Sequence, residues 1–375
     1  MNRYFAVSAP GLEPFTAAEL RQLCPGREVG IEPGGVAFTG ELADLQRANL
    51  QLRTASRVLA RLGTFFRATT FEELQQRAAR LPWERFLTPG QPVALRVTCH
   101  KSKLYHSDAV ARHISAALDE RLGRSSPILK ADDESDQPPQ LVVVRLMEDR
   151  VTVSVDSSGT ILHKRGYRQA VAKAPLRETL AAAILLASGW DRTTPLLDPF
   201  CGSGTIPIEA ALLAACLPPG LHRRFAFLDW PGFDEPAWQA ILAEANALRK
   251  ETPPILASDR DAGAIRMAQA NAERAGVSDR IQFQCQAVSA LAPPPGPGWV
   301  VTNPPYGLRV SQGRDLRNLY AQFGNVLRRQ CPGWRVGVLC SDPVLLGQMQ
   351  VELDMNLALV NGGVRVRLGL GTVGQ

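Results

Sequence analysis

Short apolar segments alternate with helix-forming segments through the second half of the chain, and this alternation restricts the fold more than any other feature. The apolar segments cover residues 194–198, 254–259, 281–285, 299–302 and 334–339. Helical patterns separate most of them, over residues 176–188, 206–215, 262–275 and 316–328. Strands that alternate with helices in this way form a doubly wound parallel sheet. Asn361-Gly362 lies between two β-type runs near the C-terminus and predicts an antiparallel hairpin that finishes the sheet.

The first half of the sequence has the patterns of two smaller α+β units, residues 1–58 and 59–157. Helices are expected over residues 11–23, 42–52, 70–79 and 108–122. Strands are expected over residues 4–7, 35–39, 93–97, 141–146 and 151–155. The basic, glycine-interrupted run 162–168 indicates a linker over 158–173, which leads into a larger domain over 174–375.

Composition limits the class of protein without naming a function. With 45% hydrophobic and 21% charged residues, the chain is typical of globular rather than disordered or membrane proteins. It has no apolar run of roughly 18 residues and no apolar signal segment at its start, so we expect a cytoplasmic protein. The net charge of +6 suits a polyanionic partner, and the seven cysteines lack metal-site spacing. We therefore expect a monomer that binds no metal and no membrane.

The first motif with chemical meaning is the segment 198–205, DPFCGSGT, between a strand and a helix. Gly202 and Gly204 allow a tight turn, and the start of the helix offers free N–H groups to a carboxylate or phosphate. Pro207 stands where the dinucleotide fingerprint has its third glycine. By itself the segment is either a structural turn or a nucleoside site.

Asp259 ends the next strand and has the position from which a carboxylate can accept both hydroxyls of a ribose. The interval from Asp198 to Asp259 is much longer than the roughly 20 residues of a compact βαβ unit. The extra residues indicate an insertion, for which 218–252 is the candidate.

The third motif, Asn303-Pro304-Pro305-Tyr306, directly follows the strand 299–302. The two prolines lack N–H donors and stiffen the turn, so the Asn303 side chain and the Pro304 carbonyl become fixed acceptors. Two acceptors that hold both hydrogens of an exocyclic base amine let its nitrogen attack a methyl group, while Tyr306 stacks on the base. The motif therefore predicts methyl transfer to an exocyclic amine.

In this order the three motifs resemble those of class I S-adenosylmethionine-dependent methyltransferases that act on exocyclic amines. Residues 173–182, KAPLRETLAA, and 102–110, SKLYHSDAV, are similar to segments of the THUMP-domain RNA methyltransferases that modify guanine N2. The resemblance covers nearly the whole chain. It implies a ferredoxin-like domain over 1–58, a THUMP domain over 59–157, and a Rossmann-like methyltransferase sheet over 174–375.

The inserted segment is similar to the branch of this family that modifies large-subunit ribosomal RNA, through residues 223–227, 230–234 and Trp238. The resemblance thus implies a guanine in 23S rRNA as substrate, with tRNA as the alternative. It implies that the catalytic residues are Asn303, Pro304, Pro305 and Tyr306. The residues expected to bind S-adenosylmethionine are Asp198, Phe200, Gly202, Gly204, Thr205, Asp259 and Arg260. Those expected to bind RNA are His100, Lys101, Lys103, Tyr105, His106, Lys164, Arg165 and Arg168.

One position departs from the family pattern. Ala287 stands where the family usually has an acid that holds the adenine amine, and Gln286 precedes it. This departure implies weaker cofactor binding or a substitute contact from Gln286. Three other functions stay open on these residues: methylation of adenine N6 in DNA, methylation of a protein glutamine amide, and a noncatalytic RNA-binding role in assembly.

Overall fold

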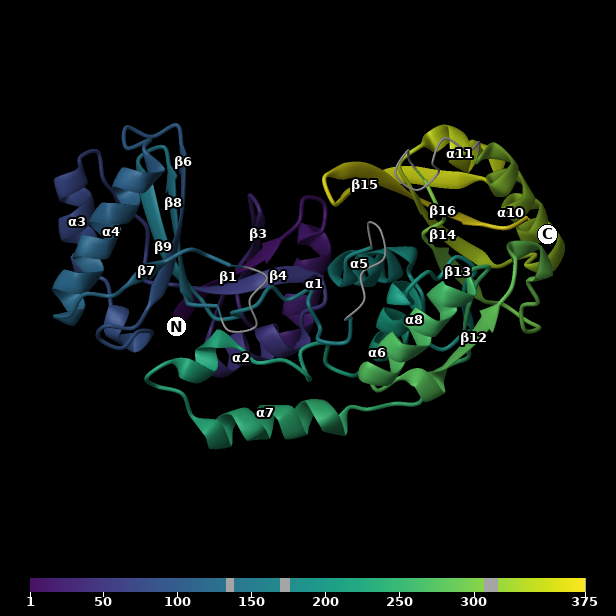
Figure 1. The fold of residues 1–375 in the computed structure, drawn as a ribbon, viewed down its shortest axis with the longest axis horizontal. Helices are drawn as coiled ribbons and strands as arrows, with labels where there is room; N and C mark the ends of the chain where they lie inside the picture. The colour runs from purple at the N-terminus through teal and green to yellow at the C-terminus, as the bar shows by residue number, and fades with distance from the viewer. Residues whose placement is uncertain (133–137, 169–175, 307–315, 375) are drawn as a thin grey trace. The chain divides into compact units, whose positions relative to one another are not determined.

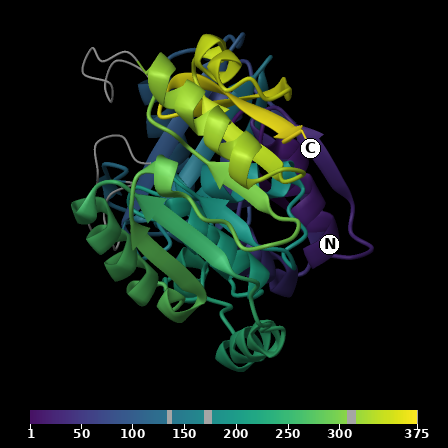
Figure 2. The ribbon, with the colours of Figure 1, turned by 90° about the vertical axis from the view of Figure 1, so that its right-hand side faces the viewer.

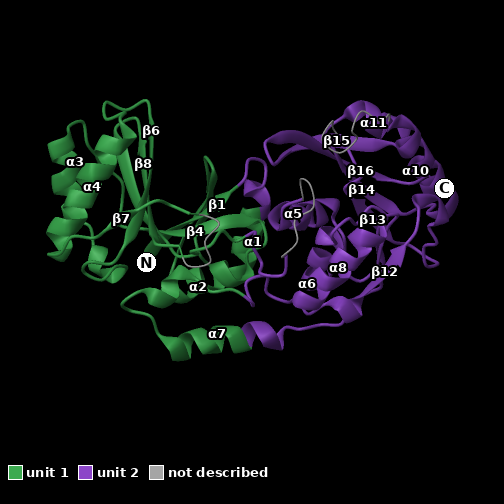
Figure 3. Cartoon of the chain, in the orientation of Figure 1, with its two compact units in different colours: residues 1–8, 16–162, 223–243 green, residues 9–15, 163–222, 244–375 purple. Residues whose placement is uncertain are grey.

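A computed structural model describes residues 1–132, 138–168, 176–306 and 316–374. The chain divides into two compact units (Figure 3). Unit 1 comprises residues 1–8, 16–162 and 223–243, and unit 2 comprises residues 9–15, 163–222 and 244–375. The segment 223–243, part of the predicted insertion, therefore belongs to unit 1 although its neighbours on both sides belong to unit 2.

Among the described residues, unit 1 contains one mixed sheet of nine strands in the order β2-β3-β1-β4-β9-β8-β6-β7, with β5 paired to β9. The strands are β1 Asn2–Ser8, β2 Val29–Glu32, β3 Gly35–Gly40, β4 Ala55–Arg61, β5 Phe66–Arg67, β6 Val93–His100, β7 Ile128–Leu129, β8 Gln140–Met147 and β9 Arg150–Asp156. β6 runs parallel to β7 and β8, and the other pairs are antiparallel. The pairing of β4 with β9 joins the two expected N-terminal domains in one sheet.

The helices of unit 1 include one, α4, that buries the apolar positions its spacing predicted. They are α2 Leu42–Gln51, α3 Phe71–Ala79 and α4 Ser107–Leu122, with a 3-10 helix at Trp83–Arg85 and part of α1 Glu13–Leu23 and α7 Glu235–Ala247. The buried side chains of α4 are those of Val110, Ile114, Ala117 and Leu118. The helix ends at Gly123, whose φ of 70° closes it in the left-handed conformation.

Unit 2 has a seven-stranded sheet in the order β12-β11-β10-β13-β14-β16-β15 over its described residues. The strands are β10 Leu196–Asp198, β11 Ile255–Asp259, β12 Ile281–Cys285, β13 Trp299–Thr302, β14 Arg335–Cys340, β15 Leu353–Asn361 and β16 Val364–Thr372. The strands from β12 to β14 are parallel, whereas β16 and β15 are antiparallel to their neighbours. The predicted doubly wound sheet and its C-terminal hairpin are confirmed.

Helices cover both faces of this sheet, which explains why its central strands β10 and β13 are buried along their whole length. One face packs against α5 Glu178–Ser188, α6 Thr205–Ala214 and α8 Ala262–Arg274 (Figure 1). The other packs against α10 Arg317–Gln330 and α11 Pro343–Gln348, with α10 toward the viewer in Figure 2. Successive strand residues alternate between the faces, so Leu196 lies in the first core and Leu197 in the second.

Within the described ranges, no helix has both the length and the apolar composition needed to cross a membrane. The same residues contain no group of three or more His, Cys, Asp or Glu side chains arranged to hold a metal ion.

Candidate active site

The first and third motifs meet because β10 and β13 are neighbours in the sheet. Asp198, at the end of β10, is only 1% exposed. Its Oδ1 accepts hydrogen bonds from the Thr302 hydroxyl at 2.6 Å and from the Phe200 N–H at 3.2 Å. Burial raises the pKa of Asp198 to about 7, against the lowering effect of these two hydrogen bonds. The buried Thr302 directly precedes Asn303. It thus ties the start of the Asn-Pro-Pro-Tyr turn to the glycine loop, residues 198–205.

The two glycines of the loop meet different requirements. Gly204 has a φ of 85°, and a Cβ there would lie 3.0 Å from the Ala268 Cβ, so close packing against α8 also demands glycine. Gly202 has a φ of 52° but open space on its Cβ side, and its N–H donates to Asp259 Oδ2 at 3.1 Å. Asn271 of α8 donates from Nδ2 to the Ser203 carbonyl at 2.9 Å and thereby fixes the loop to α8.

Asp259 ends β11 beside this loop, as its position in the sequence predicted. It is half-buried, and its Oδ1 accepts from the N–H of Asp261 at 3.0 Å. The carboxylate is therefore fixed between two backbone donors while part of it stays accessible. Arg260 and Ala287 are both exposed, and the Gln286 N–H donates to the Asp259 carbonyl at 3.0 Å.

Asn303 presents a buried acceptor that nothing in the described structure uses. Its Oδ1 is buried and has no hydrogen-bond partner among the residues that can be described. The following turn is held from two other elements: the Tyr320 hydroxyl of α10 donates to the Pro305 carbonyl at 3.3 Å, and Asn361 Nδ2 donates to the Tyr306 hydroxyl at 3.0 Å. Burial raises the pKa of Tyr306. The turn is thus fixed by two contacts, and its asparagine oxygen has no partner among the described residues.

The structure therefore brings Asp198, Phe200, Gly202, Gly204, Thr205, Asp259 and Arg260 together with the four residues of the Asn-Pro-Pro-Tyr turn at the carboxyl ends of β10, β11 and β13. Sequence reasoning missed four residues that hold this arrangement: Asn271, Thr302, Tyr320 and Asn361. Thr302 had a signal, because it is a polar residue at the end of an otherwise apolar strand. The other three are far from the motifs in sequence and had none.

Most residues expected to bind RNA lie exposed in unit 1, between β6 and α4. They are His100, Lys101, Lys103, Tyr105 and His106. The rings of Tyr105 and His106 lie 4.1 Å apart, and Tyr105 is 68% exposed. Lys164 is half-buried in unit 2.

Arg165 and Arg168 pair with buried acids, whereas the sequence-based expectation placed them on RNA. Arg165 is 4% exposed, and its Nε lies 3.5 Å from Glu209 Oε1. Arg168 Nε lies 3.2 Å from Glu178 Oε1, and its Nη2 donates at 2.7 Å to the hydroxyl of Thr205, the first residue of α6. Both side chains neutralise buried acids, so this end of the linker packs within unit 2.

Residues 165–365, more than half of the chain, match the family model described as the RMKL-like methyltransferase domain. The chain belongs to the RMKL-like methyltransferase family. Residues 3–59 of this family member match the RlmL ferredoxin-like domain, and residues 68–156 match the THUMP domain.

Curated relatives agree with this membership. This RMKL-like methyltransferase is 34% identical over 96% of its length to slr0064 of Synechocystis sp., provisionally named an RNA methyltransferase, and covers 94% of that protein. It is 36% identical over 98% of its length to a ribosomal RNA large subunit methyltransferase K/L of Syntrophotalea carbinolica. The chain spans about half the length of that relative, 53%.

Two solved structures have the same fold along the whole chain. SMU.472, provisionally named a methyltransferase and solved with SAH, matches with a TM-score of 0.87 and 31% identity, covering 100% of this chain and 98% of its own. A Listeria monocytogenes protein, titled a predicted N6-adenine-specific DNA methylase, matches with a TM-score of 0.87 and 34% identity, covering 99% and 96%. The family and the fold are therefore those of a methyltransferase.

Proposed function

We propose that this RMKL-like methyltransferase methylates the exocyclic N2 amine of a guanine in 23S ribosomal RNA. The observation that carries the proposal is the free, buried Oδ1 of Asn303. A buried acceptor without a partner costs free energy. A donor that arrives with the substrate would remove this cost. An exocyclic amine is such a donor.

The residues at the glycine loop fit the cofactor S-adenosylmethionine, whose demethylated product is named with SMU.472. When bound, this cofactor supplies a methyl group on a positively charged sulfur. The open side of Gly202 lets a ligand approach the backbone, and the accessible part of Asp259 can accept the ribose hydroxyls. The proposed cofactor site contains five residues besides Gly202 and Asp259: Asp198, Phe200, Gly204, Thr205 and Arg260.

In the proposed mechanism the protein orients the amine and uses no covalent intermediate. Asn303 Oδ1 and the Pro304 carbonyl accept the two amine hydrogens and direct the nitrogen lone pair toward the methyl group, and the nitrogen releases one of these hydrogens to solvent as a proton on methylation. The Pro305 carbonyl already accepts from Tyr320, and the hydroxyl of Tyr306 is held by Asn361, so the Tyr306 ring is fixed for stacking on the base. Burial raises the pKa of the Cys201 thiol, which is consistent with a packing role rather than a nucleophilic one.

Two features support RNA as the substrate. The chain has a THUMP domain match, and exposed basic and aromatic side chains lie between β6 and α4. Such side chains bind phosphates and unstacked bases. The names of the K/L relatives and the inserted segment 223–243 favour large-subunit rRNA over tRNA.

Adenine N6 in DNA is the second candidate, because the Listeria structure has that title. The test is transfer of labelled methyl from S-adenosylmethionine to rRNA, tRNA and DNA, followed by mass spectrometry of the nucleosides. We expect N2-methylguanosine in 23S rRNA. Label in N6-methyladenosine would instead indicate DNA adenine as the substrate, and label in tRNA would indicate tRNA. Cofactor binding without transfer to any acceptor would support a noncatalytic assembly role.

A further inference from the structure

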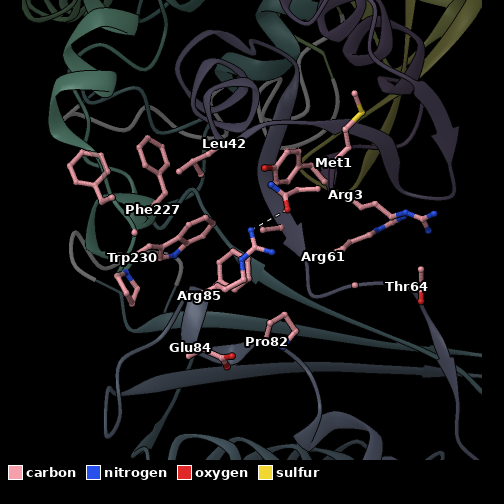
Figure 4. A pocket seen from close by; sticks show the side chains of 18 residues that line it. Met1, Arg3, Leu42, Arg61, Thr64, Pro82, Glu84, Arg85, Phe227 and Trp230 are labelled. Carbon is pink, nitrogen blue, oxygen red and sulfur yellow. Dashed lines mark hydrogen bonds between the residues drawn. The ribbon is translucent and has the colours of Figure 1, made fainter.

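A cavity of about 590 Å³ lies in unit 1 and shares no residue with the proposed active site (Figure 4). Its wall comes from β1, β4, the 3-10 helix Trp83–Arg85 and the inserted segment 223–243. This volume lies within the roughly 300–1,000 Å³ of sites that bind small organic groups. The inserted segment, which the proposed chemistry leaves without a role, therefore builds part of a binding-sized cavity.

Phe227 and Trp230 form an aromatic side of the cavity in Figure 4, and three more aromatic residues line it: Tyr4, Phe86 and Phe233. Trp230 packs edge-on against Phe86 with ring centroids 4.8 Å apart, and its Nε1 donates to Gln140 Oε1 at 3.0 Å. Because the polar atom of Trp230 is already used inside the protein, its ring presents an apolar surface to the cavity.

Figure 4 shows Arg3 and Arg61 across the cavity from Phe227 and Trp230, and Arg61 pairs with Glu32. Arg85 projects between the two sides and donates to Asn2 Oδ1 at 3.1 Å. Within the described part of the chain, neither Arg3 nor Arg85 has an ion-pair partner. Glu84, the one carboxylate in the wall, pairs with Arg121 at 2.6 Å. The cavity is therefore positively charged.

We propose that this cavity binds one unstacked nucleotide of the substrate RNA, with the base on the aromatic side and a phosphate at Arg3 and Arg85. The inference rests on the proposed RNA substrate. Aromatic faces and arginines together are the means by which proteins bind single-stranded RNA. The inserted segment then contributes to RNA binding, because Phe227, Trp230 and Phe233 line the cavity.

The inserted segment is anchored firmly enough to hold these rings in place. Arg223 donates to the carbonyls of Thr160 and Ile161, the latter at 2.9 Å, and lies 5.3 Å from the centroid of the Phe225 ring. Phe225 and Phe227 stack 5.2 Å apart. The segment that carries Phe227 and Trp230 is thus anchored to the rest of unit 1.

The direct test measures binding of a fluorescein-labelled single-stranded RNA tetranucleotide by fluorescence anisotropy. Gly232 lines the cavity and has open space beside it without a positive φ, so Gly232→Trp adds bulk there without backbone strain. Its control is Gly30→Trp, at a glycine in β2 with the same freedom and outside the cavity. We expect Gly232→Trp to raise the Kd about tenfold or more and Gly30→Trp to leave it unchanged.

Charge reversal tests the phosphate contact. We expect Arg3→Glu to raise the Kd about tenfold and to weaken its dependence on KCl, compared with Arg21→Glu at an exposed arginine of α1. Equal Kd values for the cavity variants and their controls would overturn the inference. So would binding of an acidic peptide as tight as that of the tetranucleotide.

Methylation assays separate this inference from the proposed function. If wild type methylates rRNA, Gly232→Trp and Arg3→Glu should raise the KM for RNA about tenfold, and their affinity for S-adenosylmethionine should stay that of wild type. An unchanged KM in an enzyme that methylates rRNA would refute the nucleotide site alone. No transfer to RNA by wild type would refute the proposed function, and the tetranucleotide titration would then decide on the cavity by itself.

Discussion

At the scale of single residues, the free oxygen of Asn303 gives the sharpest prediction. Asn303→Ala removes one of the two acceptors for the amine, so we expect kcat to fall by about 10² or more. The measurement is methyl transfer at saturating RNA and cofactor. Asn325→Ala, at an exposed asparagine of α10, is the matched control and should retain wild-type turnover. Equal turnover in both variants would exclude the role assigned to Asn303.

Asp198 predicts a pH dependence of stability. Its pKa is about 7 in the folded protein and near 3.8 in the unfolded chain. Between these values the unfolded chain has lost the proton that the folded protein keeps, so the contribution of Asp198 to stability is greatest below about pH 3.8, falls as pH rises to about 7, and is then constant. Asp198→Asn should abolish this fall.

The measurement is the thermal midpoint of the cofactor-free protein from pH 4 to pH 8. The midpoint of wild type should drop relative to that of Asp198→Asn as the pH rises. Asp279→Asn, at an exposed carboxyl, should follow wild type throughout. Parallel curves for wild type and Asp198→Asn would contradict the raised pKa.

The motif residues could be identified from the sequence because their chemistry depends on residues a few positions away. Which charged side chains become buried could not be identified in this way. Arg165 and Arg168 follow a basic run and were expected to contact RNA, yet both meet buried acids, Glu209 and Glu178. Burial raises the pKa of Glu178 to about 6, while Arg168 lowers it. No local pattern shows which acid will lie beside a given arginine after folding.

At the scale of elements, the connection from β10 to α6 predicts different effects for two neighbouring glycines. Gly204→Ala combines a left-handed backbone with a contact at 3.0 Å to Ala268, so we expect a loss of about 2 to 4 kcal/mol of stability. Gly202→Ala meets open space and should lose only about 1 to 2 kcal/mol. Urea unfolding measures both values, and equal losses would show that the contact with α8 is unimportant.

Elements with strong periodicity were predicted well, and short or weakly apolar strands were not. The pattern of α4 gave both its bounds and its buried face. Strand β4, with the sequence ASRVLAR, has alanines and arginines where strand formers are usual, so it had no signal. It exists because β1 and β9 flank it and supply its hydrogen bonds.

At the scale of the whole molecule, the inserted segment is predicted to depend on Arg223. Its guanidinium donates to the backbone carbonyls of residues 158, 160 and 161, whereas the neighbouring Arg224 is exposed and pairs with Asp229. Arg223→Ala should lower the free energy of opening the segment by about 1.5 to 3 kcal/mol. Cleavage within residues 218–252 should then be about 10- to 100-fold faster.

Limited proteolysis with mass spectrometry of the fragments measures this effect. Arg224→Ala is the matched control, since it removes the same side chain one residue later and should leave the cleavage rate unchanged. Faster cleavage in both variants would mean that charge rather than anchoring protects the segment.

The sequence by itself determined the alternating sheet, its final hairpin and the three motifs at its carboxyl edge, because strand period, glycine turns and proline stiffness act over a few residues. Only the tertiary structure decided the rest. The bond from Thr302 to Asp198 spans 104 residues, β4 pairs with β9, and residues 223–243 join unit 1. These contacts depend on which buried surfaces fit each other after the chain closes long loops, and that choice is a property of the whole packed molecule.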